Sequence, residues 1–102
     1  MLRERAMNDQ FESVHNYNEE SVFRSVIDCA VRYPRLVDDP ELLADVACVA
    51  LNHLPPRYIR HAVDMRYYMS DEESAKNDAA VEAAVEFAFG FVQSRGGSRP
   101  GG

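Results

Sequence analysis

The stretch "VDDPELLADVACVALNHLPP", residues 37–56, predicts a helix that is marked at both of its ends. Asp39 is a candidate N-cap, and Pro40 suits the first helical position, where a missing N–H costs no hydrogen bond. Pro55 and Pro56 end the helix. Apolar side chains at three- and four-residue spacing predict a single buried face, formed by Leu43, Val46, Ala47, Ala50, Leu51 and Leu54.

Two further helices are predicted, one on each side of this stretch. Residues 16–33 repeat apolar side chains at helical spacing, and Pro34 ends that helix because a residue before proline avoids the helical conformation. Ser70 or Asp71 begins the last helix, whose first turns are acidic. Its apolar stripe is formed by Ala75, Ala79, Val81, Ala84, Val85, Ala88 and Val92, and is widened by Phe87, Phe89 and Phe91.

Between the second and third helices, the segment "RYIRHAVDMRYYM" (57–69) changes the apolar period from 3.6 to about 2. This pattern predicts a β-hairpin with strands near 57–62 and 65–69. The fold class is therefore mainly α: a three-helix domain with a small β-hairpin between helices two and three. This domain spans residues 15–94, between a flexible N-terminus (1–14) and a disordered, glycine-rich tail (95–102).

Length and charge limit the classes of function. The 102 residues suit one small domain, and 17 Asp and Glu against 11 Lys and Arg give a net charge of −6. Such a charge disfavours a nonspecific DNA or RNA binder. No apolar run is long enough to span a bilayer, and the N-terminus lacks the apolar stretch of a secretory signal, so we expect a cytoplasmic protein. The small core and the aromatic side chains of the last helix predict a homodimer.

Neither catalysis nor metal binding is indicated. Cys29 and Cys48 lie in apolar helical runs, where we expect buried free thiols in a reducing cytoplasm. They do not form a CxxC pair, so no zinc site is predicted. His15, His53 and His61 are far apart in the sequence, and no catalytic motif accompanies them. We therefore predict that the protein is not an enzyme.

The segment after the paired prolines concentrates guanidiniums and phenols in an acidic chain. Guanidinium pairs with phosphate oxygens and with the O6/N7 edge of guanine, and it stacks on bases, as tyrosine does. A carboxylate at Asp64 or Asp71 suits the N1/N2 edge of guanine. The segment thus indicates a nucleotide ligand. The alternative is that these arginines only cover the helices and pair with surplus carboxylates, at about 0–1 kcal/mol per exposed pair.

Two strings together resemble a known family. "NYNEESV" (16–22) and "ALNHLPPRY" (50–58) are similar to motifs of the ComFB family, small bacterial proteins named for late competence development. The resemblance covers residues 15–93. The matching positions are Asn16, Tyr17, Glu19, Val22, Asp45, Ala50, Leu51, Asn52, Leu54, Pro55, Pro56 and Tyr58.

The resemblance implies a mainly helical homodimer and two roles known among relatives. One is the binding of cyclic dinucleotides, notably cyclic di-GMP; the other is structural zinc held by a cysteine cluster before the position of Asp45. This chain has "RLVDDPELLAD" there, without cysteine, so no zinc site is carried over. Asn52 and Tyr58 fall on the motif itself, and four neighbours are added on their chemistry. The candidate ligand-binding residues are Asn52, Arg57, Tyr58, Arg60, Asp64 and Arg66.

We therefore expect a cytoplasmic receptor for cyclic di-GMP that relays a second-messenger signal through contacts with a downstream protein. A dimer would present two copies of the site to a ligand with two-fold symmetry. No cofactor or metal is expected. The identity of the cyclic dinucleotide stays open, with cyclic di-AMP as the competitor. The alternative function is a non-catalytic protein-interaction module in competence, pilus or motility machinery that binds no nucleotide.

Overall fold

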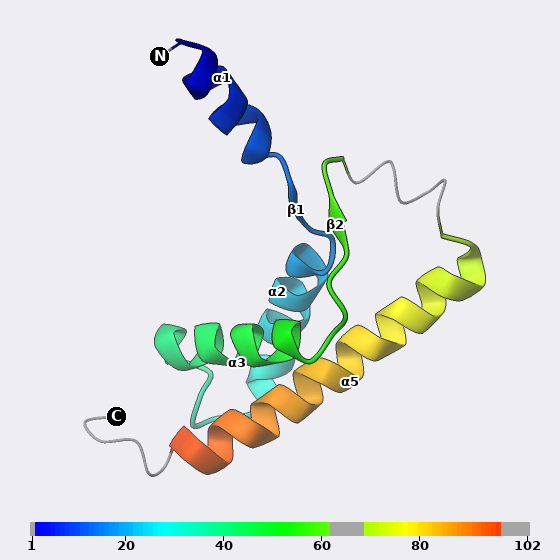
Figure 1. Ribbon diagram of the computed structural model, residues 1–102. Coiled ribbons are helices and arrows are strands. Elements are labelled where there is room, and N and C mark those ends of the chain that lie inside the picture. The colour runs from blue at the N-terminus through cyan, green and yellow to red at the C-terminus, as the bar shows by residue number, and fades with distance from the viewer. Residues whose placement is uncertain (1, 62–68, 97–102) are drawn as a thin grey trace.

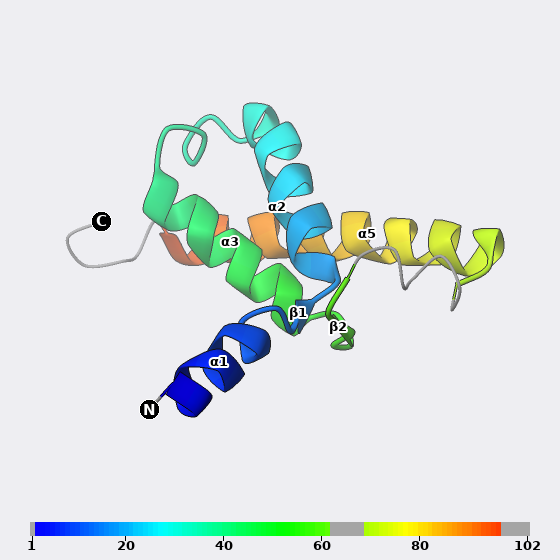
Figure 2. The ribbon, with the colours of Figure 1, turned by 90° about the horizontal axis from the view of Figure 1, so that it is seen from above.

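The computed structural model describes residues 2–61 and 69–96. Helices α2 and α3 lie across one side of the long helix α5 and pack against each other, while α1 projects away from this body (Figures 1 and 2). The elements in chain order are α1 (Leu2–Phe11), β1 (His15–Asn16), α2 (Asn18–Cys29), the short 3₁₀ helix η1 (Ala30–Arg32), α3 (Pro40–Asn52), β2 (Tyr58–Ile59) and α5 (Asp71–Gly96).

Helix α3 begins and ends as its sequence predicts. The side chain of Asp39 accepts a hydrogen bond from the Leu42 N–H at 3.1 Å, and Pro40 occupies the first turn. At the other end, the His53 N–H donates to two carbonyls of the last turn, and the paired prolines follow. The cap satisfies one of the amides that every helix start leaves without a partner.

The ends of α2 and α5 also follow local signals. The helical path of α2 tightens into η1 and stops at Tyr33, whose extended backbone (φ −128°, ψ 77°) is the conformation required before Pro34. At the start of α5, the Ser70 hydroxyl accepts a hydrogen bond from the Glu73 N–H at 3.1 Å. The 26 residues of α5 extend over about 39 Å, so this helix passes beneath both α2 and α3.

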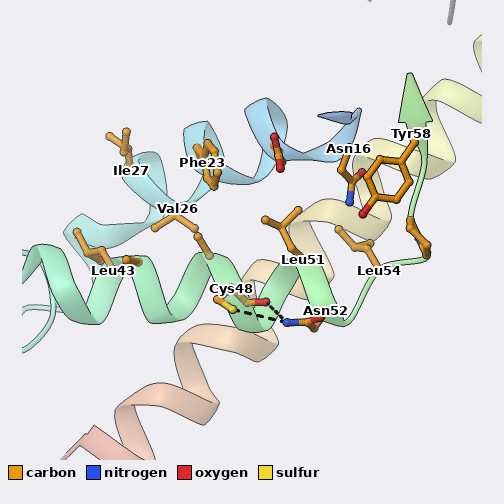
Figure 3. A pocket seen from close by; sticks show the side chains of 14 residues that line it. Asn16, Phe23, Val26, Ile27, Leu43, Cys48, Leu51, Asn52, Leu54 and Tyr58 are labelled. Atoms are coloured by element: carbon orange, nitrogen blue, oxygen red, sulfur yellow. Dashed lines mark hydrogen bonds between the residues drawn. The ribbon is translucent and has the colours of Figure 1, made fainter. Parts of the chain in front are cut away.

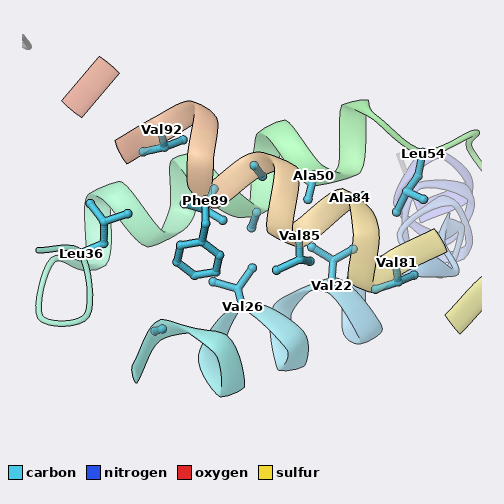
Figure 4. Packing of buried hydrophobic residues seen from close by; sticks show 14 residues of the cluster. Val22, Val26, Leu36, Ala50, Leu54, Val81, Ala84, Val85, Phe89 and Val92 are labelled. Atoms are coloured by element: carbon cyan, nitrogen blue, oxygen red, sulfur yellow. The ribbon is translucent and has the colours of Figure 1, made fainter. Parts of the chain in front are cut away.

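The three helices share one apolar core (Figure 4). Phe89 is fully buried, and its ring stacks on Tyr33 with centroids 4.3 Å apart. Phe87 and Phe91 belong to the same predicted stripe but remain 46% and 38% exposed. The buried apolar residues are Val22, Val26, Ala30, Leu36, Val46, Ala47, Ala50, Leu54, Val81, Ala84, Val85, Ala88, Phe89 and Val92.

The predicted hairpin differs from the structure in its pairing. Tyr58–Ile59 forms a strand, as expected, but its partner in the described residues is His15–Asn16, in antiparallel register. The predicted second strand, 65–69, lies outside the described residues except for Met69, which is not in a strand. The partner of Tyr58–Ile59 was expected close by in the sequence because a hairpin joins consecutive segments through a short turn. In the structure the two paired strands are distant in the sequence.

The N-terminal segment contains a helix that the sequence analysis did not predict. Helix α1 covers most of the segment expected to be flexible, and none of its residues is buried. At the other end, Arg95 and Gly96 belong to α5, and the rest of the predicted tail lies outside the described residues. No helix within residues 2–61 and 69–96 combines the length and apolar character needed to cross a membrane.

Replacing Phe89 with alanine should destabilise the fold by about 3–5 kcal/mol, because it leaves a cavity where the core helices meet and removes the stack on Tyr33. The matched change Phe87→Ala, on the same helix, should cost about 1 kcal/mol, since that ring is half exposed. Urea unfolding followed by circular dichroism measures both values. Equal losses in the two variants would contradict this description of the core.

Candidate functional site

Two segments far apart in the sequence meet at one end of the helical body. Strand β1 lies directly before α2, and strand β2 comes shortly after α3 (Figure 1). The two strands pair antiparallel, with His15 opposite Ile59 and Asn16 opposite Tyr58. The pairing therefore joins the "NY" and "PPRY" segments into one structural unit.

The side chain of Asn16 links the two segments of this β1–β2 unit through hydrogen bonds. Its Oδ1 accepts hydrogen bonds from the N–H of Asn18 at 3.0 Å and from the N–H of Arg57 at 3.4 Å. The Tyr17 N–H donates in turn to the carbonyl of Arg57 at 2.6 Å. Both backbone polar groups of Arg57 are thus held by residues 16 and 17, which fixes the direction of the chain as it leaves the paired prolines.

An open groove of about 820 Å³ runs between α2 and α3 from this unit (Figure 3). Its walls are mostly apolar, and its polar groups gather where the β1–β2 unit joins the helices. We call it the α2–α3 groove. Its lining residues are Asn16, Glu19, Phe23, Val26, Ile27, Leu43, Ala44, Ala47, Cys48, Leu51, Asn52, Leu54, Pro56 and Tyr58.

Two of the predicted site residues, Asn52 and Tyr58, line this groove: Tyr58 lies beside Asn16, and Asn52 lies on α3 next to Cys48 (Figure 3). The ring of Tyr58 is 69% exposed and therefore accessible for stacking. Asn52 ends α3, and its Nδ2 donates to the carbonyl of Cys48 at 3.0 Å. This bond holds the Asn52 side chain against the end of its own helix, so Asn52 also has a structural role.

The predicted arginines lie outside the lining of the groove. Arg57 is exposed, and among the described residues its guanidinium has no carboxylate within ion-pair distance. Arg60 is exposed and donates to the neutral side chains of Ser13 (2.9 Å) and Gln10 (2.6 Å). The remaining two candidates, Asp64 and Arg66, lie outside the described residues.

The comparison with protein families identifies the group to which this arrangement belongs. The family described as late competence development protein ComFB matches residues 15–96 of the 102. The chain belongs to the ComFB family. No curated protein and no solved structure matches it.

The range matched by the ComFB family begins at β1 and ends with α5. It therefore contains both halves of the strand pair and all three core helices. The family motifs are distant in the sequence, yet the structure brings Asn16 and Tyr17 against Arg57 and Tyr58. Helix α1 lies outside the matched range, so it is a feature of this chain beyond the family match.

The two cysteines of this ComFB-family chain are free, but the expectation that both are buried was wrong. Cys48 is exposed because its position on α3 faces the open groove instead of the core. Cys29 is half-buried and accepts a hydrogen bond from the Arg32 guanidinium at 3.1 Å, which raises the pKa of Arg32. Within the described residues, no group of three or more His, Cys, Asp or Glu side chains is placed to hold a metal ion.

Other polar contacts around the site were missed by the sequence analysis. Asn18 is fully buried, and its Oδ1 accepts a hydrogen bond from Nδ2 of Asn77 at 3.1 Å, which ties the start of α2 to α5. Gln10 and Ser13, which hold Arg60, were assigned to a flexible segment. These partners are distant along the chain and carry no local motif. The "NY" string was the one sequence signal for this part of the site. It indicated Asn16 but did not show which groups its side chain hydrogen-bonds.

Replacing Asn16 with alanine should destabilise the protein by about 1–2 kcal/mol, because two backbone amides lose their acceptor. The amides of Asn18 and Arg57 should also exchange with solvent faster, which hydrogen exchange measured by NMR detects. Asn8→Ala is the control, since Asn8 is exposed on α1. Unchanged exchange at Arg57 would show that Asn16 does not fasten the unit.

Proposed function

We propose that this chain is a cytoplasmic, non-catalytic receptor for a cyclic dinucleotide, with cyclic di-GMP as the preferred ligand, and that it relays the signal through protein contacts. The observation that carries the proposal is the β1–β2 pair. This pair holds the exposed ring of Tyr58 at the polar end of the α2–α3 groove, on the same short segment as Arg57 and Arg60.

The side chains on this segment match the parts of the ligand. The exposed Tyr58 ring offers a surface on which a purine stacks, typically worth about 1–3 kcal/mol per base. The Nδ2 of Asn52 already donates to the Cys48 carbonyl. The side-chain oxygen of Asn52 is therefore the atom that would accept a hydrogen bond from a base edge. Asp64 and Arg66 would add a second base contact and a third guanidinium, as expected from their chemistry.

Charge also favours an anionic ligand at this position. The chain as a whole carries a net charge of −6, so a phosphate needs a local surplus of positive charge. Arg57 has no ion-pair partner in residues 2–61 and 69–96, and Arg60 is bound by uncharged side chains. Neither guanidinium is neutralised by a described carboxylate, and both remain able to pair with phosphate oxygens.

The proposed receptor acts as a homodimer. Cyclic di-GMP has two-fold symmetry, and a symmetric dimer presents two identical sets of ligand-binding side chains. Each copy would contribute one stacking ring from Tyr58 and one set of guanidiniums. The dimer would also give the receptor a surface that changes when the ligand joins the two copies, which is the signal passed to a downstream protein.

A second candidate is a protein-interaction module without nucleotide, in competence, pilus or motility machinery. A row of stacked side chains on the α3–α5 surface favours it. His53 stacks on Phe87 with centroids 4.2 Å apart, Phe87 lies 6.0 Å from Phe91, and the Arg95 guanidinium lies 4.8 Å from the Phe91 ring. Exposed aromatic side chains with an arginine are typical of protein interfaces.

The double variant Arg57→Ala/Arg60→Ala should bind cyclic di-GMP at least about tenfold more weakly than the parent, because charge-assisted hydrogen bonds contribute about 1.5–3 kcal/mol each. Isothermal titration calorimetry measures the affinity. The unliganded melting temperature should change little, since both side chains are exposed. Arg24→Ala/Arg35→Ala is the matched control, with two exposed arginines elsewhere, and it should bind as the parent does.

The same titration separates the two candidate functions. A parent protein that shows no heat with cyclic di-GMP, cyclic di-AMP or linear dinucleotides at tens of micromolar would reject the receptor and favour the interaction module. Equal loss in the control variant would reject the assignment of the site to Arg57 and Arg60. Stronger heat with cyclic di-AMP would retain the receptor and change its preferred ligand.

A further inference from the structure

The apolar part of the α2–α3 groove is uncovered. Phe23 and Ile27, on its α2 wall, are 47% and 69% exposed. Glu19 lies one turn before Phe23, so the three side chains form a row at four-residue spacing, with a carboxylate at one end. An open apolar groove between two helices is the type of surface that accepts the apolar face of a third helix.

Helix α1 is a helix without a surface to pack against. Its ten residues are all exposed, with Met7 at 47% and Phe11 at 62%. Isolated helices shorter than about 12–15 residues are marginal in water, and most gain stability by packing an apolar face. A ten-residue helix without buried side chains therefore needs a surface from elsewhere.

The two surfaces match in pattern and in charge. Arg3, Met7 and Phe11 occur at four-residue spacing on α1 and lie on one face. The groove row has the same spacing and order, with a carboxylate, Glu19, where α1 has a guanidinium. Packing α1 parallel to α2 would place the arginine beside this carboxylate and the apolar pairs against each other.

Helix α1 does not pack into the groove of its own chain. Strand β1 follows α1 almost at once and is fixed by its pairing with β2. Gln10 and Ser13 are bound by the side chain of Arg60, and α1 points away from the helical body in both views (Figures 1 and 2). None of the residues of α1 is buried against the rest of the chain, so the helix is exposed to a second molecule.

We infer that α1 of one copy docks into the α2–α3 groove of a second copy, with Met7 and Phe11 against Phe23 and Ile27. The exchange is reciprocal, so two identical interfaces close a symmetric dimer. This inference supplies an interface for the homodimer of the proposed function but does not depend on nucleotide binding. Because α1 precedes the range matched by the family, the interface belongs to this chain's own N-terminal segment.

A disulfide tests the inference, because Cys48 lines the groove and is exposed. In a Cys29→Ser background, Met7→Cys should form, under mild oxidation, a linked dimer of twice the 11.5 kDa chain mass on a non-reducing gel. Adding Cys48→Ser should abolish this band. Ala6→Cys, one residue away and turned about 100° around the helix, is the matched control and should link far less.

A second measurement does not depend on cysteine chemistry. Phe11→Glu and Ile27→Glu should each convert the dimer to a monomer in light scattering at about 100 µM. Val31→Glu replaces an equally exposed apolar residue outside the groove and should leave the dimer intact. A monomeric parent, a disulfide formed within one chain, or a dimer that survives Phe11→Glu would each overturn the inference.

These outcomes are distinguishable from failure of the receptor. If the Met7→Cys variant forms the linkage to Cys48 while the parent shows no heat with cyclic dinucleotides, the proposed ligand is rejected and the interface is retained. A parent that binds nucleotide as a monomer rejects the interface and retains the ligand. The two readouts are separate, because one detects a covalent dimer and the other nucleotide binding, and Met7 and Ile27 are not among the proposed ligand-binding residues.

Discussion

The backbone of Arg57 is held on both sides by residues 16 and 17, and this small set of hydrogen bonds connects three parts of the fold. The Asn16 amide oxygen accepts from Arg57 and from the first residue of α2, and the Tyr17 N–H donates to the Arg57 carbonyl. The start of α2, the exit from α3 and the direction of α1 are consequently fixed at one point. Each bond contributes only about 0.5–1.5 kcal/mol, so the constraint comes from several bonds acting on the same short segment.

Local signals predicted the helices well because the groups that end a helix lie within a few residues of its end. Asp39 and Ser70 accept hydrogen bonds from amides in the adjacent turn, and Pro40 occupies a position where its missing N–H costs nothing, so the sequence contains the whole interaction. Burial on the last helix was harder to predict. Phe87 and Phe89 both fall on the broad predicted stripe, but the buried face is the narrower one that runs through Val85, Phe89 and Val92, and Phe89 also stacks there on Tyr33.

Contacts between distant segments could not be predicted in the same way. Strand β2 pairs with β1, and no turn residue marks that pairing because α2 and α3 separate the two strands along the chain. Arg60 was predicted as a site residue for its charge, but its partners Gln10 and Ser13 could not be predicted. They lie in an N-terminal segment that was expected to be flexible because it is polar, although most of it forms α1. The sequence resemblance indicated the family correctly but left the geometry of these contacts unknown.

The resulting surface has two chemically different regions. Its polar end combines Asn16 and Tyr58 and lies next to guanidiniums without described acidic partners, while the rest of the groove is mostly apolar. Polar side chains at one end suit the bases and phosphates of a nucleotide, and the apolar walls suit a helix. The β1–β2 unit positions both, since it orients Tyr58 on one side and α1 on the other.

An NMR titration of the ¹⁵N-labelled protein with cyclic di-GMP tests whether the strand pair is the ligand-binding unit. Backbone NOEs between His15 and Ile59 should be present before ligand is added, and the largest shift changes should then occur at residues 15–17 and 57–60, with the core residue Val85 little affected. Absence of these NOEs, or saturable shifts confined to α5, would contradict the account.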